Sequence, residues 1–352
     1  MKILAIDLGK FKSVSCLLDT ENNQTEFQTI PTLRWAFEQL LNTTHPHQVV
    51  FETSAVSGWV HDLCQSLGYR VLVANPNADA WQWRNVKRKT DKDDALKLAK
   101  LSALDQIQSV HMPTPAARQY KRLVKFRKTI VRQINQLKNG IRALFCAQGM
   151  TMLTGAKAWT LEGLAKLEKH RKSLSECNME ELWRGELDVD LTLLNTLSEQ
   201  LNQLEKYLTQ RAKQEERVQL LMSIPGVGRC LAEVIVTCLD DPHRFQNARQ
   251  VSSYAGLVPR QHQSGQTNRL GKISKRGSRL LRSTLVEAAW LSLQYNPWAV
   301  EIFNRISGGQ KTRRKTAIVA VARKLLVRCW AMLRHNQPWN PMLMQQLVEK
   351  AA

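Results

Sequence analysis

The sequence predicts a multi-domain protein that joins an α/β domain at its N-terminus to mainly helical regions further along the chain. Three observations predict this class. Residues 1–105 alternate short apolar runs with helical patterns, residues 106–215 contain two long amphipathic patterns, and residues 216–352 contain helical patterns separated by Gly, Pro and Ser. A chain of 352 residues is long enough for two or three domains with full cores.

The first ten residues contain the feature around which the candidate site is organised. The apolar run 2–6 predicts a buried strand, and Asp7 and Gly9 follow it directly. A carboxylate at the end of a central strand is costly to bury unless it binds something, and a metal ion or a phosphate-bearing ligand is the usual partner. Taken alone, Asp7 is better explained as the cap of a turn.

The order of the predicted elements over residues 1–105 indicates a mixed sheet covered by helices. Three successive strands are followed by alternating helices and strands, which is the order of the ribonuclease H-like fold. A second acid, Glu52, ends one of the later strands. We expect strands at 2–6, 12–18, 26–30, 49–51 and 69–74, and helices at 33–41, 59–67 and 91–104.

The predicted helix at 91 begins with a run of acids. Thr90 is a good N-cap, and the macrodipole favours acids in the first turn, so the run has an ordinary explanation. Asp91 and Asp94 nevertheless share one face, whereas Asp93 points elsewhere and is expected to be solvated. With the two acids that end strands, this face can complete a set of four carboxylates at one edge of the sheet: Asp7, Glu52, Asp91 and Asp94.

Four close carboxylates could not all stay ionised without cations. Hard oxygen ligands of this kind select Mg²⁺ or Mn²⁺ rather than zinc. Two ions about 3.5–4 Å apart would stabilise the attacking and leaving oxygens of a phosphodiester. The sequence therefore predicts a site for two divalent ions that acts on nucleic acid.

The charge of the chain also indicates a polyanionic partner. The formal net charge is +21, and most of it lies in residues 104–150 and 251–352, whereas the rest of the chain is nearly neutral. Such self-repulsion is normally retained only where a polyanion offsets it. Arg84, Lys87 and Arg88 in the segment 81–89 form a candidate rim that leads nucleic acid to the acids, although an ordinary surface loop explains this segment equally well.

Two long amphipathic patterns predict a helical spacer. Residues 117–146 carry an apolar seam, and the leucines between 194 and 208 form an a/d series. The second helix could fold back on the first or pair with another subunit, and we favour a coiled-coil spacer that dimerises. The first helix also carries a cationic stripe that suits a phosphate backbone, although a solvated face is the default for such a stripe. The stripe consists of Lys121, Lys125, Lys128 and Arg132.

Residues 221–228 match the helix-hairpin-helix pattern, in which a Pro-Gly-Val-Gly turn joins two helices. The backbone N–H groups of Gly226 and Gly228 could hold a DNA phosphate without reading sequence, although an ordinary tight turn explains the same pattern. Further along, Ser264 and Gly265 are expected on a polar loop in a cationic field made by Arg269, Lys272, Lys275, Arg276 and Arg279. A serine hydroxyl needs a base or a metal to react, and only His262 lies near in sequence. From the residues alone, a solvated loop serine is the better explanation.

The cysteines and the apolar runs of the sequence indicate the cellular compartment of the protein. The seven cysteines contain no CxxC pair, and their odd number disfavours a disulfide framework. No signal pattern and no apolar run long enough for a bilayer is present, so we expect no membrane partner. A reducing cytoplasm is the simplest expected compartment.

The chain as a whole resembles the DEDD transposases of bacterial insertion sequences, the family that includes the Piv-type DNA invertases and the bridge-RNA-guided recombinases. The matching pieces cover the chain nearly end to end in the right order. They are Ile6-Asp7-Leu8-Gly9, Phe51-Glu52, Lys89-Thr90-Asp91 with Asp94-Ala95, Ile224-Pro225-Gly226-Val227-Gly228, Ala255-Gly256-Leu257-Val258-Pro259 with Ser264-Gly265, and Ala322-Arg323-Lys324-Leu325 with Trp330.

The resemblance implies a RuvC-like DEDD domain at 1–105, a coiled-coil spacer at 106–215 and a C-terminal transposase domain at 216–352. It implies that the four acids bind Mg²⁺ and that Ser264 attacks DNA to form a covalent phosphoserine link. It further implies that a non-coding bridge RNA pairs with donor and target DNA, and that one composite site combines domains of a dimer or tetramer. The stretch between Pro259 and Ser264 is short for the family, and Ser252, Ser253, Ser274 and Ser278 lie near.

Three other functions remain open. A RuvC-like structure-specific endonuclease would use the acids with metal-activated water and would not need Ser264. A non-catalytic nucleic-acid-binding protein would need neither the acids nor the serine. A sugar kinase-like ATPase would use Asp7-Leu8-Gly9-Lys10 as a phosphate loop, but no second glycine-rich loop accompanies it and the cationic surplus fits nucleic acid better.

Overall fold

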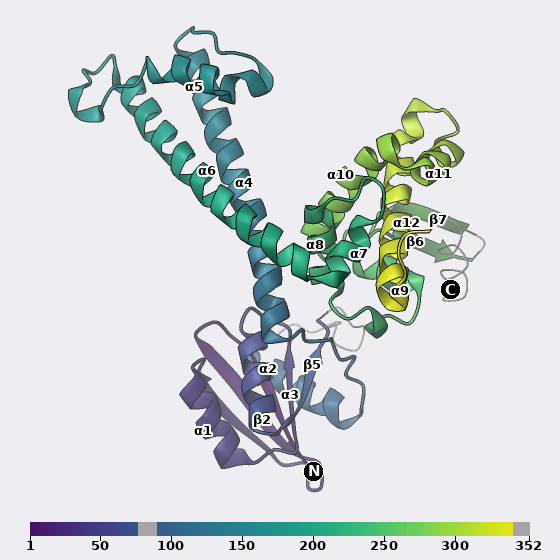
Figure 1. The fold of residues 1–352 in the computed structure, drawn as a ribbon. Helices are drawn as coiled ribbons and strands as arrows, with labels where there is room; N and C mark the ends of the chain where they lie inside the picture. Colours follow the sequence, from purple (N-terminus) through teal and green to yellow (C-terminus); the bar gives the residue numbers. More distant parts are fainter. Residues whose placement is uncertain (77–89, 266, 341–352) are drawn as a thin grey trace. The chain divides into compact units, whose positions relative to one another are not determined.

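The computed structural model describes residues 1–76, 90–265 and 267–340. The chain forms two compact units, Met1–Ala116 and Ala117–Ala352, which are considered separately. Figure 1 shows the sheet of the first unit, the long paired helices and the helical bundle of the second. The division of the chain into three functional domains stays a prediction.

The first unit is built on a five-stranded mixed sheet in the order β3-β2-β1-β4-β5. β1 pairs antiparallel with β2, as β2 does with β3, whereas β1–β4 and β4–β5 are parallel pairs. This is the predicted meander followed by parallel additions, so the mixed α/β class is confirmed. The strands are β1 (Lys2–Asp7), β2 (Lys12–Asp19), β3 (Thr25–Pro31), β4 (Gln48–Glu52) and β5 (Arg70–Ala74).

Helices cover both faces of this sheet. Leu4 and Ile6 of β1 belong to the core that contains residues of α1 (Arg34–Thr44) and α2 (Ser57–Ser66). Ile3 and Ala5 belong to a second core that contains residues of α3 (Asp91–Ala103). Because successive side chains of a strand point to opposite faces, β1 is buried on both sides and reads as a continuous apolar run.

The second unit begins with two long helices that lie side by side, α4 (Pro115–Ala147) and α6 (Leu182–Gln214). Ile134 and Ile141 of α4 share one core with Leu187 and Leu194 of α6. Leu197, Leu201 and Leu204 flank this core, whereas Leu208 belongs to the core of the helical bundle. The apolar seam is therefore used within the chain, as an intramolecular hairpin. The favoured alternative, in which the seam pairs two subunits, is not needed to bury it.

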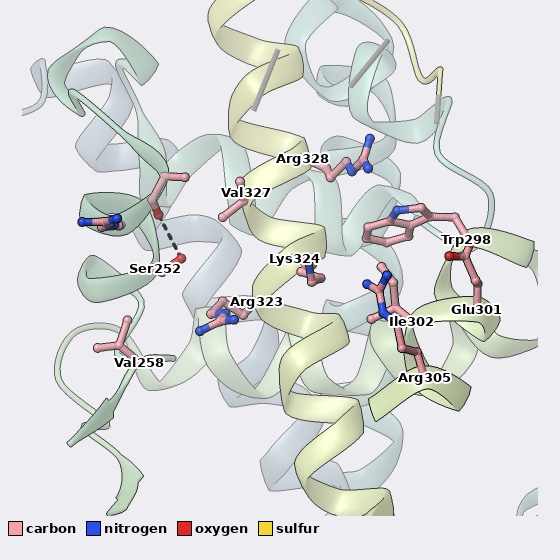
Figure 2. A pocket seen from close by; sticks show the side chains of 12 residues that line it. Ser252, Val258, Trp298, Glu301, Ile302, Arg305, Arg323, Lys324, Val327 and Arg328 are labelled. Atoms are coloured by element: carbon pink, nitrogen blue, oxygen red, sulfur yellow. Dashed lines mark hydrogen bonds between the residues drawn. The ribbon is translucent and has the colours of Figure 1, made fainter. Parts of the chain in front are cut away.

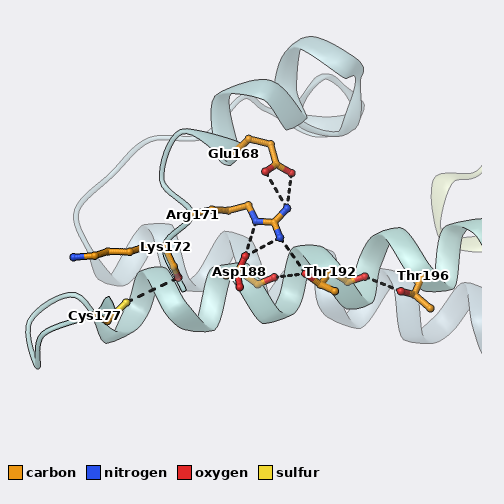
Figure 3. A network of polar contacts seen from close by, with 7 residues as sticks. All are labelled: Glu168, Arg171, Lys172, Cys177, Asp188, Thr192 and Thr196. Atoms are coloured by element: carbon orange, nitrogen blue, oxygen red, sulfur yellow. Dashed lines mark hydrogen bonds and ion pairs between the residues drawn. The ribbon is translucent and has the colours of Figure 1, made fainter. Parts of the chain in front are cut away.

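At the far end of this helical hairpin, polar contacts around Arg171 connect the segment between the two long helices to α6 (Figure 3). The Arg171 guanidinium pairs with Glu168 at the end of α5 (Leu161–Glu168) and with Asp188 of α6, and it donates to Thr192 Oγ1 at 3.1 Å. Partly exposed pairs of this kind contribute about 0–1 kcal/mol each, so they orient the segment more than they stabilise it.

At the other end of the hairpin, a buried carboxylate forms hydrogen bonds that connect the hairpin to the helical bundle. Glu233 on α8 (Arg229–Leu239) is fully buried. It accepts a hydrogen bond from the Tyr120 hydroxyl of α4 at 3.3 Å and from Arg229 Nη1 at 2.8 Å. Arg229 also pairs with Glu205 of α6. Burial raises the pKa of Glu233, and the nearby Arg229 guanidinium opposes this rise.

The bundle itself surrounds α12 (Arg314–His335). Its core contains apolar residues of every helix of the bundle, and the Trp330 indole donates to the carbonyl oxygen of Pro242 at 2.8 Å. The other helices are α7 (Glu216–Met222), α9 (Ala248–Tyr254), α10 (Arg279–Tyr295) and α11 (Pro297–Ser307). None of the helices described by the structure has both the length and the apolar character that crossing a bilayer requires.

Candidate active site

Two of the predicted acids end neighbouring parallel strands. Asp7 is the last residue of β1 and Glu52 is the last residue of β4, and the residues just before them, Ile6 and Phe51, lie opposite each other. Parallel strands have their carboxyl ends at the same edge of a sheet, so both carboxylates belong to that edge. Both residues are half-buried. The strands thus place two acids as the sequence predicts.

The other two acids start α3, and the cap of this helix determines their roles. The Asp93 backbone N–H donates to Thr90 Oγ1 at 3.2 Å, and the Thr90 backbone N–H donates to Asp93 Oδ2 at 3.0 Å. The prediction that Thr90 caps the helix is confirmed. The expectation that Asp93 is a solvated acid is wrong, because its carboxylate closes the capping box.

Asp91 and Asp94 have different environments. Asp94 is only 8% exposed and precedes Ala95 in the core that joins α3 to β1, whereas Asp91 is exposed. Among residues 1–76, 90–265 and 267–340, no group of three or more His, Cys, Asp or Glu side chains has an arrangement that could hold a metal ion. The convergence of all four acids on one pair of ions therefore stays a prediction. The candidate rim residues Arg84, Lys87 and Arg88 lie outside the described residues.

Ser264 lies at the end of a strand and not on the expected loop. β6 (Pro259–Ser264) and β7 (Thr267–Ile273) form an antiparallel ribbon in which Ser264 is opposite Thr267. Ser264 is exposed, and its hydroxyl makes no hydrogen bond to the described part of the chain. The sequence does not predict this ribbon because most of its residues are polar and exposed, and of its two strands only Ile273 packs against a core.

Two glycines permit close backbone contact at the base of the ribbon. Gly256 and Gly277 have φ angles of +67° and +78°. A Cβ at Gly256 would lie 2.0 Å from the Arg276 carbonyl oxygen, and a Cβ at Gly277 would lie 2.0 Å from that of Tyr254. Side chains are excluded from both positions, since the two chain segments are in direct backbone contact.

Arg282 completes this base, and nothing in the sequence distinguishes it from the cationic residues around it. Its Nη1 donates to the carbonyl oxygens of Ala255, Arg276 and Gly277 at 3.1, 2.7 and 3.1 Å. Arg282 is therefore a positioning residue for the segment that carries Ser264. Its neighbours Arg269, Lys272, Lys275, Arg276 and Arg279 are exposed, as a role in phosphate binding requires.

The cationic stripe of α4 is less uniform than predicted. Lys125 and Arg132 are exposed, whereas Lys121 is half-buried. Lys128 is placed 3.4 Å from a carboxylate oxygen of Glu287 on α10, so its charge is partly offset within the chain. A pair this exposed is weak enough to be replaced by a phosphate contact.

The Pro-Gly-Val-Gly turn joins two helices, α7 and α8, as predicted, but its first glycine is needed for a different reason. Gly226 has a φ of +86°, and a Cβ there would lie 3.1 Å from the Ser292 backbone of α10. Asn296 Nδ2 donates to the Pro225 carbonyl oxygen at 3.4 Å on the same side. Gly226 thus permits close packing against α10, whereas Gly228 is exposed at the N-cap of α8. A phosphate contact at these glycines stays a prediction.

Comparison with known proteins gives two family matches. Residues 218–304 match the model described as the transposase IS116/IS110/IS902 family, and residues 4–147 match the DEDD-type IS110 transposase model. The first match contains the ribbon of β6 and β7 with Ser264, and the second contains all four acids.

Individual proteins are similar over most of the chain. The transposase for insertion sequence element IS1111A of Coxiella burnetii is 30% identical over 72% of this chain and 68% of its own length. The transposase for insertion sequence element IS1328 of Yersinia enterocolitica is 27% identical over 94% of this chain and 96% of its own. The pilin gene-inverting protein of Moraxella lacunata is 26% identical over 96% and 97%.

Proposed function

Because the chain belongs to the IS116/IS110/IS902 family of transposases, we propose that it recombines DNA with a set of carboxylates and one serine nucleophile. DEDD-type transposases use divalent metal ions, and the donors here fit this chemistry. The observation that carries the proposal is the placement of Asp7 and Glu52 at the carboxyl ends of adjacent parallel strands. In this proposal, residues 1–105 are a RuvC-like nuclease domain.

The carboxylates of Asp7, Glu52, Asp91 and Asp94 would hold two Mg²⁺ or Mn²⁺ ions, because hard oxygen donors are the ligands these ions prefer. Bound there, the ions would supply electrostatic stabilisation of the oxygens that attack and leave phosphorus. The burial of Asp94 on α3, beside the core that includes β1, favours a fixed ligand at this position. Asp91 is exposed and would join the set at its solvent side.

Ser264 then acts as the nucleophile. Its Oγ forms a bond to phosphorus, the bond from phosphorus to one sugar oxygen breaks, the Oγ proton is lost and the leaving oxygen gains a proton. The phosphoserine link conserves the energy of the phosphodiester, so the hydroxyl of a second strand can attack it and release Ser264. The exposure of Ser264 at the end of an anchored ribbon supports this role.

The acids and Ser264 belong to different compact units of the chain. A composite site of this kind can combine units of two subunits, and we propose a dimer or tetramer for the active assembly. The coiled-coil spacer of the proposal, residues 106–215, and the C-terminal transposase domain, residues 216–352, are its other two parts. Gly226 and Gly228 belong to the proposed helix-hairpin-helix, which would contact DNA phosphates.

A non-coding bridge RNA would select the donor and target sequences. No base-reading motif is present in the sequence, and pairing between nucleic acids can supply specificity while the protein contacts backbones. The net charge of +21 supports a partner with many phosphates. Sequencing of RNA that copurifies with the full-length protein tests this part: one enriched species with segments complementary to both DNA sites supports it, and random fragments contradict it.

The chemistry is tested by recombination of donor and target DNA with Ser264→Ala and, as the matched control, Thr267→Ala on the opposite strand of the ribbon. We expect Ser264→Ala to abolish strand exchange and Thr267→Ala to retain it. If Ser264→Ala still cleaves DNA at the wild-type rate, the protein uses metal-activated water as a structure-specific endonuclease does.

A further inference from the structure

A cavity in the helical bundle has a strongly cationic lining that the proposed chemistry does not use. It has a volume of about 440 Å³ and lies between α9, α11 and α12 (Figure 2). Five cations line it, from all three helices, together with the single acid Glu301 and the indole of Trp298. The cations are Arg249 of α9, Arg305 of α11, and Arg323, Lys324 and Arg328 of α12.

Three of these cations are not offset by carboxylates of the described chain. Arg305, Arg323 and Lys324 form no ion pair there, and neither does Glu301. Other surface cations in this unit, such as Lys128 and Arg171, do form ion pairs with acids. The lining therefore concentrates positive charge in a concave space, where the field is stronger than on a convex surface.

The cations are also partly withdrawn from water. Arg328 is only 8% exposed, and its guanidinium lies over the ring of Trp298 at 5.0 Å. Lys324 and Arg323 are half-buried. Burial lowers the pKa of Lys324, and the neighbouring charges of Arg305, Arg323 and Arg328 lower it further. Like charges held together at this depth destabilise the fold, and a bound anion would offset that cost.

We propose that this cavity is a phosphate-binding subsite that receives the backbone phosphates of a single nucleic-acid strand where the strand bends into the bundle. The inference rests on the proposed function, because it assumes that the protein handles nucleic acid. Guanidinium groups bind phosphate oxygens in pairs, and apolar side chains such as Ile302 and Val327, with Trp298, suit the sugar and base that accompany each phosphate. A concave site of this size can hold a single strand more readily than it can hold the surface of a duplex.

The test measures the affinity of the full-length protein for mixed-sequence single-stranded oligonucleotides, one DNA and one RNA, over a range of salt concentrations. The variant is Arg323→Gln/Lys324→Gln. The control is Lys157→Gln/Lys169→Gln, which removes the same charge from exposed positions near the end of the helical hairpin. Inorganic pyrophosphate serves as a competitor in each case.

We expect the cavity variant to lower affinity for DNA, RNA or both by about tenfold or more. The slope of log affinity against log salt should fall by about 0.7 for each phosphate that the variant no longer neutralises. Its melting temperature should stay unchanged or rise, because repulsion is removed, whereas a merely structural role would lower it. Binding is measured in the presence of EDTA, so the proposed metal site does not contribute and failure of the catalytic proposal is measured separately.

An unchanged salt slope in the cavity variant would overturn the inference. An equal loss of affinity in the control variant would also overturn it, since net charge alone would then explain the effect. Loss of pyrophosphate binding without any change in oligonucleotide binding would show that the cavity takes free phosphates and not a strand.

Discussion

Thr90 and Asp93 cap each other at the start of α3, with each backbone N–H bonded to the side chain of the other residue. This reciprocal cap assigns Asp93 to the stability of the helix. It also fixes the first turn, so that Asp94 is held against the core shared with β1 while Asp91 stays at the surface. Adjacent carboxylates with identical chemistry thus have separable roles.

Asp93→Ala and Asp94→Ala should therefore have opposite effects. Loss of the cap should lower the free energy of unfolding by about 1 kcal/mol while strand exchange is retained. Loss of the Asp94 carboxylate should abolish strand exchange with little loss of stability. Denaturant unfolding and a strand-exchange assay on the same preparations measure both quantities. Retained exchange in Asp94→Ala would contradict a role of this acid in metal binding.

Arg282→Lys should loosen the ribbon that carries Ser264. Lysine keeps the charge, but its single ammonium cannot reproduce the contacts of Arg282 with three carbonyl oxygens. We expect faster hydrogen exchange in residues 259–273, a loss of about 1–3 kcal/mol in stability and slower formation of the DNA adduct. Arg279→Lys, one helical turn earlier and exposed, is the control, and hydrogen exchange in residues 259–273 should then match the wild type.

Arg229→Ala should produce a pH-dependent loss of stability. Burial already raises the pKa of Glu233 above its ordinary value of 4.5, so the folded protein binds this proton more tightly than the unfolded chain does. Stability therefore falls as pH rises through that raised pKa. Removal of the guanidinium raises the pKa further and leaves a buried charge, with a cost of about 3–5 kcal/mol at pH 8.

The loss in Arg229→Ala should be smaller at pH 5, where Glu233 can be protonated. Adding Glu233→Gln to this variant should remove the extra pH dependence, because no ionisable group is then left at this position. Urea unfolding at pH 5 and pH 8 gives the comparison. A loss that is equal at both pH values would show that the pair contributes through packing and not through its charges.

The sequence predicts the sheet of the first unit well because its signals are local. The apolar run before Asp7, the acid that ends β4 and the cap at Thr90 each follow from a few neighbouring residues. The ribbon of β6 and β7 has no such signal, since most of its residues are polar and no apolar alternation runs along either strand.

Features that depend on long-range contacts could not be predicted. Gly226 matches a phosphate-binding turn in sequence, but its close neighbour is Ser292 of α10, and only the fold supplies that contact. Arg282 is likewise an ordinary basic residue in the sequence, and although Arg323 and Lys324 belong to a segment that matches the family, nothing in the sequence places them in one cavity with Arg249 and Arg305. Their roles come from the carbonyl oxygens and helices that surround them.

The most direct test of the account is mass spectrometry of the protein after incubation with donor and target DNA, guide RNA and Mg²⁺. The account predicts a nucleotide adduct on the peptide that contains Ser264, and its absence in Asp94→Ala or when EDTA replaces Mg²⁺. Strand exchange that proceeds with no adduct on Ser264 would contradict it, as would an adduct that forms equally well in Asp94→Ala.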